Sequence, residues 1–293
     1  MSNIDLIRER LNKLQSKNTS GGFEKIDYST IFWKPKLGST TVRIVPRKSN
    51  RDFPFAEVSF HQYNVFKKSV YSLTNFGEKD PVVQLVRELY DENTEESKDL
   101  AKKISPRTKY YAQVLVRGEE NLGVRLWEFN KTTYEKLLAV MANEDYGEID
   151  DIAAGTDLTI EGYNDVVKIG KKEVKYIAVN VTPKRNMTPL ASDAALVQSY
   201  LENQKDILEL YKKHSYEDIK TMLREYLDPK ENTSDSNEKT PEVKDDLVYS
   251  NPLVEEDEDD APAPVVQSTT RQATSTSAKS SRDRFKEVFP EEE

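Results

Sequence analysis

The chain has 293 residues and a net charge of -9 at pH 7, from 43 Lys and Arg residues against 52 Asp and Glu residues. The whole excess of negative charge lies in residues 229–293, which contain 17 acidic and 8 basic residues. The negative net charge of the chain therefore does not exclude nucleic acid as a ligand of residues 1–228. The absence of cysteine excludes disulfides and thiolate zinc sites, and because no signal-like or membrane-length apolar run is present, we expect a cytoplasmic protein without membrane contact.

Residues 1–21 are predicted to form a short basic helix that ends at Gly21 and Gly22. Apolar side chains recur in it at helical spacing, and a helix this short needs a partner to cover such a stripe. Packing on its own domain and docking on a neighbouring protomer both explain the pattern, and docking would give cooperative self-association. The stripe and its basic neighbours are Ile4, Ile7, Arg8, Arg10 and Leu11.

Residues 22–228 are predicted to form the folded core, which is mainly β with α. One helix is expected between the fourth and fifth strands, over Lys131–Asn143 and capped by Asn130. This order is typical of a five-stranded Greek-key barrel of the OB type with flanking helices, although an SH3-like barrel or a small sandwich would give a similar pattern. The expected strands are Thr41–Pro46, Glu57–Tyr63, Tyr110–Arg117, Gly123–Phe129, Asp157–Tyr163 and Val174–Thr182.

Residues 64–108 interrupt these strands and are predicted to form an inserted subdomain, in which Pro81 opens a helix. A very polar stretch, Asp91–Lys103, follows that helix. Two more helices are expected after the last strand, over Ala194–Lys213 and Tyr216–Leu227, and the second starts with a capping box. The apolar face of the Pro81 helix comprises Val82, Leu85, Val86 and Leu89.

Residues 229–293 are predicted to be a disordered acidic tail. Six consecutive acidic residues, Glu255–Asp260, and a Ser/Thr-rich stretch leave too few apolar side chains to bury a core. The tip of the tail differs, because Phe285, Val288 and Phe289 occupy positions i, i+3 and i+4 among charged residues. We expect this tip to bind a partner as a short helical or extended motif; solvated disorder without a partner is the alternative.

Motifs for catalysis are scarce in this sequence. No P-loop, Gly-rich dinucleotide turn or nucleophile elbow is present. Four acidic residues could in principle hold a divalent ion for a nuclease, but they lie in a predicted loop that has no scaffold to bring them together. We therefore expect a protein that is not an enzyme and that holds no metal. The four acidic residues are Asp145, Glu148, Asp150 and Asp151.

Several predicted strands combine aromatic and basic side chains. Flat rings can stack on unpaired bases while nearby cations bind phosphates, which is the combination that single-stranded nucleic acid requires. For each ring the alternative is burial in the core, but Arg125 shares a predicted strand face with Trp127 and argues against burial of that face. The candidate DNA-binding residues are Arg43, Arg47, Lys48, Phe60, Tyr63, Lys67, Lys68, Lys109, Tyr110, Tyr111, Arg125, Trp127 and Phe129.

The order of these features resembles one protein family over essentially the whole chain, the helix-destabilising single-stranded-DNA-binding proteins of T-even-type bacteriophages. The resemblance rests on Thr41–Pro46, on Phe53–Ala56 ahead of His61, and on Tyr110–Val116 and Val124–Phe129. It implies cooperative coating of single strands through the N-terminal helix during DNA replication, recombination and repair, in the cytoplasm of an infected bacterial host. It also implies recruitment of replication and recombination proteins through the tail. Its leading DNA contacts would be Arg43, Lys48, Tyr110, Tyr111 and Trp127.

One feature of this family is missing. The prototype holds a structural zinc in its insertion through one His and three Cys; His61 matches the His position, but Asp80–Val83 stands where a Cys-Pro-Val-Cys pair would be. The resemblance therefore implies a zinc-less variant without a cofactor. Its insertion would be held by the packing of Val82, Val83, Leu85 and Leu89.

Two other functions remain open at the level of sequence. One is a protein-interaction adaptor, whose barrel binds a peptide and whose tail tip docks on a replication or packaging enzyme. The other is the metal nuclease that would depend on the acidic loop. For the single-strand binder, the tail is expected to compete with DNA for a basic cleft, because the tail carries the whole negative excess.

Overall fold

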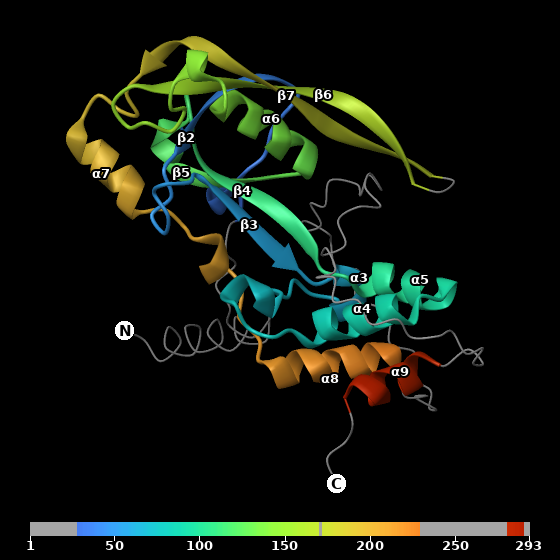
Figure 1. The fold of residues 1–293 in the computed structure, drawn as a ribbon. Helices are drawn as coiled ribbons and strands as arrows, with labels where there is room; N and C mark the ends of the chain where they lie inside the picture. The colour runs from blue at the N-terminus through green and yellow to red at the C-terminus, as the bar shows by residue number, and fades with distance from the viewer. Residues whose placement is uncertain (1–27, 170–171, 229–279, 290–293) are drawn as a thin grey trace, which may run out of the picture.

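A computed structural model describes residues 28–169, 172–228 and 280–289. The described chain forms a twisted sheet and, beside one end of it, a layer of helices (Figure 1). Strand β3 leads into the helical layer and β4 returns from it, so this layer is largely an insertion between two strands that pair with each other. The predicted helix at residues 1–21 and residues 229–279 of the tail lie outside the described residues.

Seven strands form one mixed sheet in the order β1-β5-β4-β2-β6-β7, and β3 pairs with β4. β4 is central because one of its edges pairs first with β3 and then with β2, while the other edge pairs with β5. β1 runs parallel to β5, and the other pairs are antiparallel. The strands are β1 Phe32–Trp33, β2 Gly38–Val45, β3 Phe55–Phe60, β4 Arg107–Val116, β5 Val124–Phe129, β6 Gly155–Ile169 and β7 Lys172–Thr188.

This sheet confirms a mainly β fold with α elements, but it does not confirm a closed five-stranded barrel of the OB type. Among the described residues β1 and β7 each pair with one strand and not with each other, so the sheet stays open. β6 and β7 are longer than the sequence predicts, with 15 and 17 residues, and form one long hairpin. At Gly162 of β6 an added Cβ would lie 2.1 Å from the backbone oxygen of Lys36, so this close crossing requires glycine.

Most predicted helices are present, and their caps are the expected ones. Asn130 accepts a hydrogen bond from the backbone of Thr133 at the start of α6, and Ser215 opens α8 with a capping box. Most of the polar stretch Asp91–Lys103, for which the sequence predicts no helix or strand, belongs to α5, which starts with a capping box at Thr94. The helices are α2 Tyr28–Ile31, α3 Tyr63–Phe66, α4 Pro81–Glu92, α5 Glu95–Ile104, α6 Lys131–Met141, α7 Ala194–Glu202, α8 Tyr216–Leu227 and α9 Ser281–Val288.

One helix prediction was too long. The helix expected over Ala194–Lys213 ends at Glu202, and a segment with only a short 3-10 turn at Ile207–Glu209 follows it. Asp206 begins that turn by accepting a hydrogen bond from the backbone of Leu208, and a side chain that caps a new turn competes with continuation of the helix. This segment becomes important for the candidate site, because it crosses from the sheet to the helical layer.

Four clusters of buried apolar residues hold the described fold, and two of them are the largest. The first lies on one side of the sheet and is closed by α6, with Val42, Ile44 and Leu137 completely buried. The second lies in the helical layer, where α4 and α8 pack together around Leu85 and Leu223. No helix in the described ranges is both long and apolar enough to span a lipid bilayer.

Candidate nucleic-acid interface

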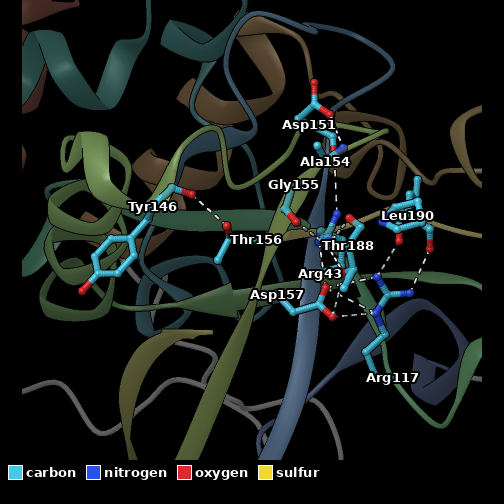
Figure 2. Close-up of polar contacts among 11 residues, drawn as sticks. Arg43, Arg117, Tyr146, Asp151, Ala154, Gly155, Thr156, Asp157, Thr188 and Leu190 are labelled. Atoms are coloured by element: carbon cyan, nitrogen blue, oxygen red, sulfur yellow. Dashed lines mark hydrogen bonds and ion pairs between the residues drawn. The ribbon is translucent and has the colours of Figure 1, made fainter. Parts of the chain in front are cut away.

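Arg43 on β2 has 0% of its side-chain surface exposed. Its Nε donates to Asp157 Oδ1 at 2.8 Å, and its terminal nitrogens donate to the backbone oxygens of Asp151, Gly155 and Thr188 (Figure 2). A Cβ on Gly155 would lie 2.4 Å from the Asp151 oxygen and 2.8 Å from Nη1 of Arg43, so the guanidinium depends on a glycine there. The sequence predicted a leading DNA contact at Arg43, but all three nitrogens are engaged inside the protein and no phosphate can reach them in this conformation.

Arg117, at the end of β4, completes the same network. Its Nε and Nη2 both lie 3.1 Å from oxygens of Asp157, and Nη1 donates to the backbone oxygen of Leu190 at 2.8 Å (Figure 2). Burial lowers the pKa of Arg43, and the neighbouring Asp157 carboxylate opposes that shift. Two forked guanidinium groups around one carboxylate therefore join β2, β4 and β6 as a structural ion-pair network.

The rings predicted to stack on bases mostly belong to the sheet core. Trp127 is 1% exposed and meets Trp33 edge to face, with ring centroids 5.3 Å apart. Tyr110 stacks on Tyr134 at 4.3 Å, and Phe129 is also buried beside Trp127. These three candidate rings fill the core, as large aromatic side chains commonly do, and bases cannot stack on them while the core is intact.

Arg125 is buried on the same face of β5 as Trp127, contrary to the argument from sequence that a cation would keep this face in water. Its Nη2 lies 2.6 Å from Oε2 of Glu119, which is 39% exposed. A carboxylate at the rim of the sheet therefore compensates the charge, which is the condition under which a buried cation is tolerated.

The opposite face of the sheet carries a second group of rings. Phe60 on β3 and Tyr111 on β4 are 7% and 2% exposed, and Tyr71 from the insertion lies against Phe60 at 4.9 Å. Residues 203–211, which form most of the segment between α7 and α8 (Figure 1), pack on these rings through Ile207, Leu208, Leu210 and Tyr211 and are here called the covering segment. Its Ile207 is buried among them, and the Tyr71 hydroxyl donates to the Ile207 backbone oxygen.

A pocket of about 240 Å³ opens where the covering segment meets the end of β2 and the start of β3. Arg47, Lys48, Tyr111 and Gln113 line it, together with Asp206 and Glu209 of the covering segment. Besides the apolar packing of Ile207, polar contacts hold the covering segment here: Gln113 donates to the backbone oxygen of Lys205 at 2.7 Å, and the Lys48 backbone donates to the Gln204 side chain at 2.9 Å. Cations, an aromatic ring and amide groups thus converge on one concave site, as a nucleotide would require.

Lys109 extends the positive charge along β4. Its Nζ lies 3.0 Å from Oε1 of Glu128 and 5.6 Å from the centre of the Phe60 ring, and 37% of the side chain is exposed. The other Glu128 oxygen accepts from the Tyr111 hydroxyl at 2.9 Å. Burial, and then the charge of Glu128, raise the pKa of Tyr111, so this hydroxyl remains a donor at neutral pH.

A further group of cations lies where the covering segment reaches the helical layer. Lys67 and Lys68, which directly follow α3, are exposed, and the neighbouring Tyr63 is 46% exposed. Burial, then the charge of Lys68 and that of Lys212, lower the pKa of His214, while Asp218 opposes them. Lys68, which follows α3, and Lys212, which precedes α8, are therefore close enough to His214 for their charges to act on it.

The structure therefore divides the predicted DNA-binding residues into three groups. Arg125, Tyr110, Trp127 and Phe129 are buried on the core side of the sheet and Arg43 is buried on its other side, while Phe60 and Tyr111 lie beneath the covering segment. The third group borders the covering segment from its pocket end to α3. It consists of Arg47, Lys48, Tyr63, Lys67, Lys68 and Lys109.

Sequence reasoning missed the covering segment and its cations. Lys205 lies in this segment and Lys212 and His214 lie just beyond it; the first two fall within the helix predicted over Ala194–Lys213 and His214 directly follows that helix, so the sequence assigns them no binding role. The polar run that ends α7 at Asn203 was the available signal, because such residues favour caps and turns over helix interiors.

His61 and Asp80 meet inside the insertion. His61 Nε2 lies 3.0 Å from Asp80 Oδ2, and both side chains are completely buried. The same oxygen accepts from Ser72 Oγ and from the Leu73 backbone, each at 2.8 Å, while Oδ1 caps α4 through the backbone of Val82 at 2.9 Å. Burial raises the pKa of Asp80, but His61 and these donors outweigh it and lower the pKa below its ordinary value.

This pair does not fit a structural zinc site. Such a site takes four ligands, whereas both oxygens of Asp80 are already engaged and the apolar side chain of Val83 follows where a ligand would stand. No cluster of three or more His, Cys, Asp or Glu suited to a metal ion occurs in the described ranges, and that includes the acidic loop considered for a nuclease.

Comparison with protein-family models finds a match. A protein-family model described as "gp32 DNA binding protein like" matches residues 36–227. The match starts just before β2 and ends at the last residue of α8, so it includes the sheet, the insertion and the covering segment. A search of the curated proteins found no match.

Proposed function

The chain belongs to the gp32-like family of DNA-binding proteins, and from this membership we propose that it coats single-stranded DNA cooperatively during replication, recombination and repair. Family membership supports single-strand binding itself. The coating, the recruitment of replication and recombination proteins by the tail, and the role of Ile4, Ile7 and Leu11 in self-association are the finer parts of the proposal.

The strand is proposed to follow the covering segment. Its phosphates would meet Lys48 at the pocket, Lys109 along β4 and Lys68 beside α3, in that order. β3 joins the two ends of this path, and its six residues span roughly 20 Å at about 3.3 Å per residue, a length suited to a few nucleotides. The single observation that carries this path is the pocket, which Arg47, Lys48 and Tyr111 line together.

This site accounts for DNA binding by a body that has no net positive charge. Residues 1–228 sum to zero, so affinity has to come from a local arrangement of cations and rings. Cations spaced along one path release counterions from the strand. Tyr111 is covered by the segment, and once the segment opens its ring can stack on a base, which contributes about 1–3 kcal/mol.

Fluorescence anisotropy of a labelled oligothymidylate, titrated with the full chain at several salt concentrations, tests the proposal. Both tryptophans are buried in the core, so a label on the strand is a better reporter than tryptophan emission. A steep fall of affinity with salt is expected. Absence of binding at low salt would reject the proposal in favour of the protein-interaction adaptor, and magnesium-dependent cleavage of the strand would favour the nuclease.

A further inference from the structure

The tip of the tail lies on the helical layer as helix α9 (Figure 1). Phe285 and Phe289, which were predicted to bind a partner protein, are 5% and 7% exposed because they belong to the apolar cluster of this layer. The surface that they cover is here called the α4–α8 face. It comprises Val82, Leu85, Val86, Leu89, Ile219 and Leu223.

Charged contacts orient the tip on this face. Arg284 is 6% exposed, and its Nε lies 2.9 Å from Oε2 of Glu92 at the end of α4. Lys220 Nζ, in the first half of α8, lies 5.4 Å from the centre of the Phe289 ring, which is the last described residue of the tip. The end of α9 therefore lies near the start of α8, so the two helices run antiparallel.

The connection between these helices is much longer than this arrangement requires. Adjacent antiparallel helices need only about 2–8 connecting residues. Here 53 residues, 228–280, separate the end of α8 from the start of α9, and a chain of that length can span up to about 170 Å. The tip can therefore reach well beyond the α4–α8 face of its own chain.

We propose that the α4–α8 face also takes the tail tip of a second copy of this chain, so that tips exchange between neighbouring copies. The exchanged contacts would be the same aromatic burial and the same ion pair between Arg284 and Glu92, so exchange loses no contact. All of these contacts are between protein side chains, and the inference does not depend on DNA binding. A strand that gathers several copies would only raise their local concentration.

Crosslinking of two full-length chains tests this exchange, and the absence of cysteine from the natural chain removes background reaction. The first chain carries Asp91→Cys beside its α4–α8 face, together with Phe285→Ala and Phe289→Ala to weaken its own tip. The second chain carries only Glu287→Cys on its tip. Both cysteines replace exposed residues, and a short bismaleimide can join them only when the second chain's tip lies on the first chain's face.

A product of the two chains is expected without DNA and in higher yield on a single-stranded homopolymer. In the control pair the first chain carries Glu135→Cys on α6 in place of Asp91→Cys. Adding Glu92→Arg to the first chain of the test pair should reduce the yield of crosslinked product to that of the control pair. Adding Arg284→Glu to the second chain as well should restore the yield. A yield equal to that of the control pair in every combination would overturn exchange and leave the tip confined to its own chain. Failure of DNA binding would remove only the effect of the homopolymer.

Discussion

The side chains of Arg43 and Asp157 are joined by a 2.8 Å contact that links β2 to β6, and the guanidinium is completely buried. Replacing Arg43 with Lys keeps a positive charge but removes the forked donors, so the backbone oxygens of Gly155 and Thr188 lose their partners. We expect a loss of about 3 kcal/mol in the free energy of unfolding, because partly broken buried ion pairs are strongly destabilising. Denaturant unfolding followed by circular dichroism measures it.

The same variant separates a structural role from a DNA contact. Under conditions in which Arg43→Lys remains folded, its affinity for a labelled oligothymidylate should equal that of the natural chain. A loss of affinity without a change in stability would show that Arg43 reaches the strand and that the network opens in solution.

Lys48 should behave in the opposite way. Its side chain is exposed at the pocket and donates only to the Glu202 backbone oxygen at 3.2 Å, so Lys48→Ala should leave the unfolding transition nearly unchanged. Affinity for single-stranded DNA should fall about fivefold, which corresponds to about 1 kcal/mol for an exposed charge contact. The slope of log affinity against log salt should become shallower by about 0.7, as for one phosphate contact on a single strand.

The matched control for Lys48 is Lys184→Ala, which removes an exposed lysine from β7 at the far edge of the sheet. It should change neither the affinity nor the salt slope. Equal effects from the two substitutions would mean that binding follows overall charge and not the path along the covering segment.

His214 gives the candidate interface a pH dependence. In the free protein its pKa is lowered by burial and by Lys68 and Lys212, so a phosphate placed among these groups should raise it again. Binding then takes up a proton: the gain in affinity is complete below the pKa of the free state and is lost as the pH rises through the higher pKa of the bound state. A difference of one pKa unit between the free and bound states would give about a tenfold change in affinity.

Anisotropy titrations between pH 5.5 and pH 8 measure this effect, with His214→Gln as the comparison. The variant should bind with an affinity that changes much less over this range. A natural chain whose affinity does not vary with pH would place the strand away from the end of the covering segment that meets α8.

The sequence predicted strand positions and caps well because these depend on local patterns. The alternation at Thr41–Pro46 and the cap at Asn130 are readable without knowledge of the fold. The burial of Trp127 could not be predicted from the sequence. The alternation of side chains along a strand shows only that Trp127 shares a face with Arg125. The carboxylate of Glu119, which compensates the charge of Arg125, comes close to it only in the folded sheet. The covering segment was missed for a similar reason, since its cover of Tyr111 depends on contacts far apart in sequence.

The pair of His61 and Asp80 should hold the insertion together without a metal ion. Asp80→Asn keeps a good helix cap for α4 but removes the charge beside His61, so we expect a loss of about 3 kcal/mol in the free energy of unfolding. Asp91→Asn, an exposed position on the same helix, is the matched control and should change the free energy of unfolding by less than about 0.5 kcal/mol.

Treatment of the natural chain with a chelator completes that test. Without a metal in the insertion, EDTA followed by gel filtration should leave the midpoint of thermal unfolding unchanged. A fall of the midpoint that added zinc restores would show that His61 and Asp80 belong to a metal site after all.

Ile207 holds the covering segment on the sheet, so its substitution tests whether this segment opposes or assists DNA binding. It is 2% exposed among Phe60, Tyr71 and Tyr111, so Ile207→Ala should weaken the segment by about 2–4 kcal/mol, and hydrogen exchange of residues 203–211 should rise. If the strand stacks on the ring of Tyr111, an opened segment exposes that ring and affinity should increase although stability falls.

The matched control is Leu190→Ala. It removes a residue that is equally buried beside Val45 and Leu115, away from these rings, and should lower stability without raising affinity. A fall of affinity in Ile207→Ala would instead make the covering segment part of the DNA-binding surface.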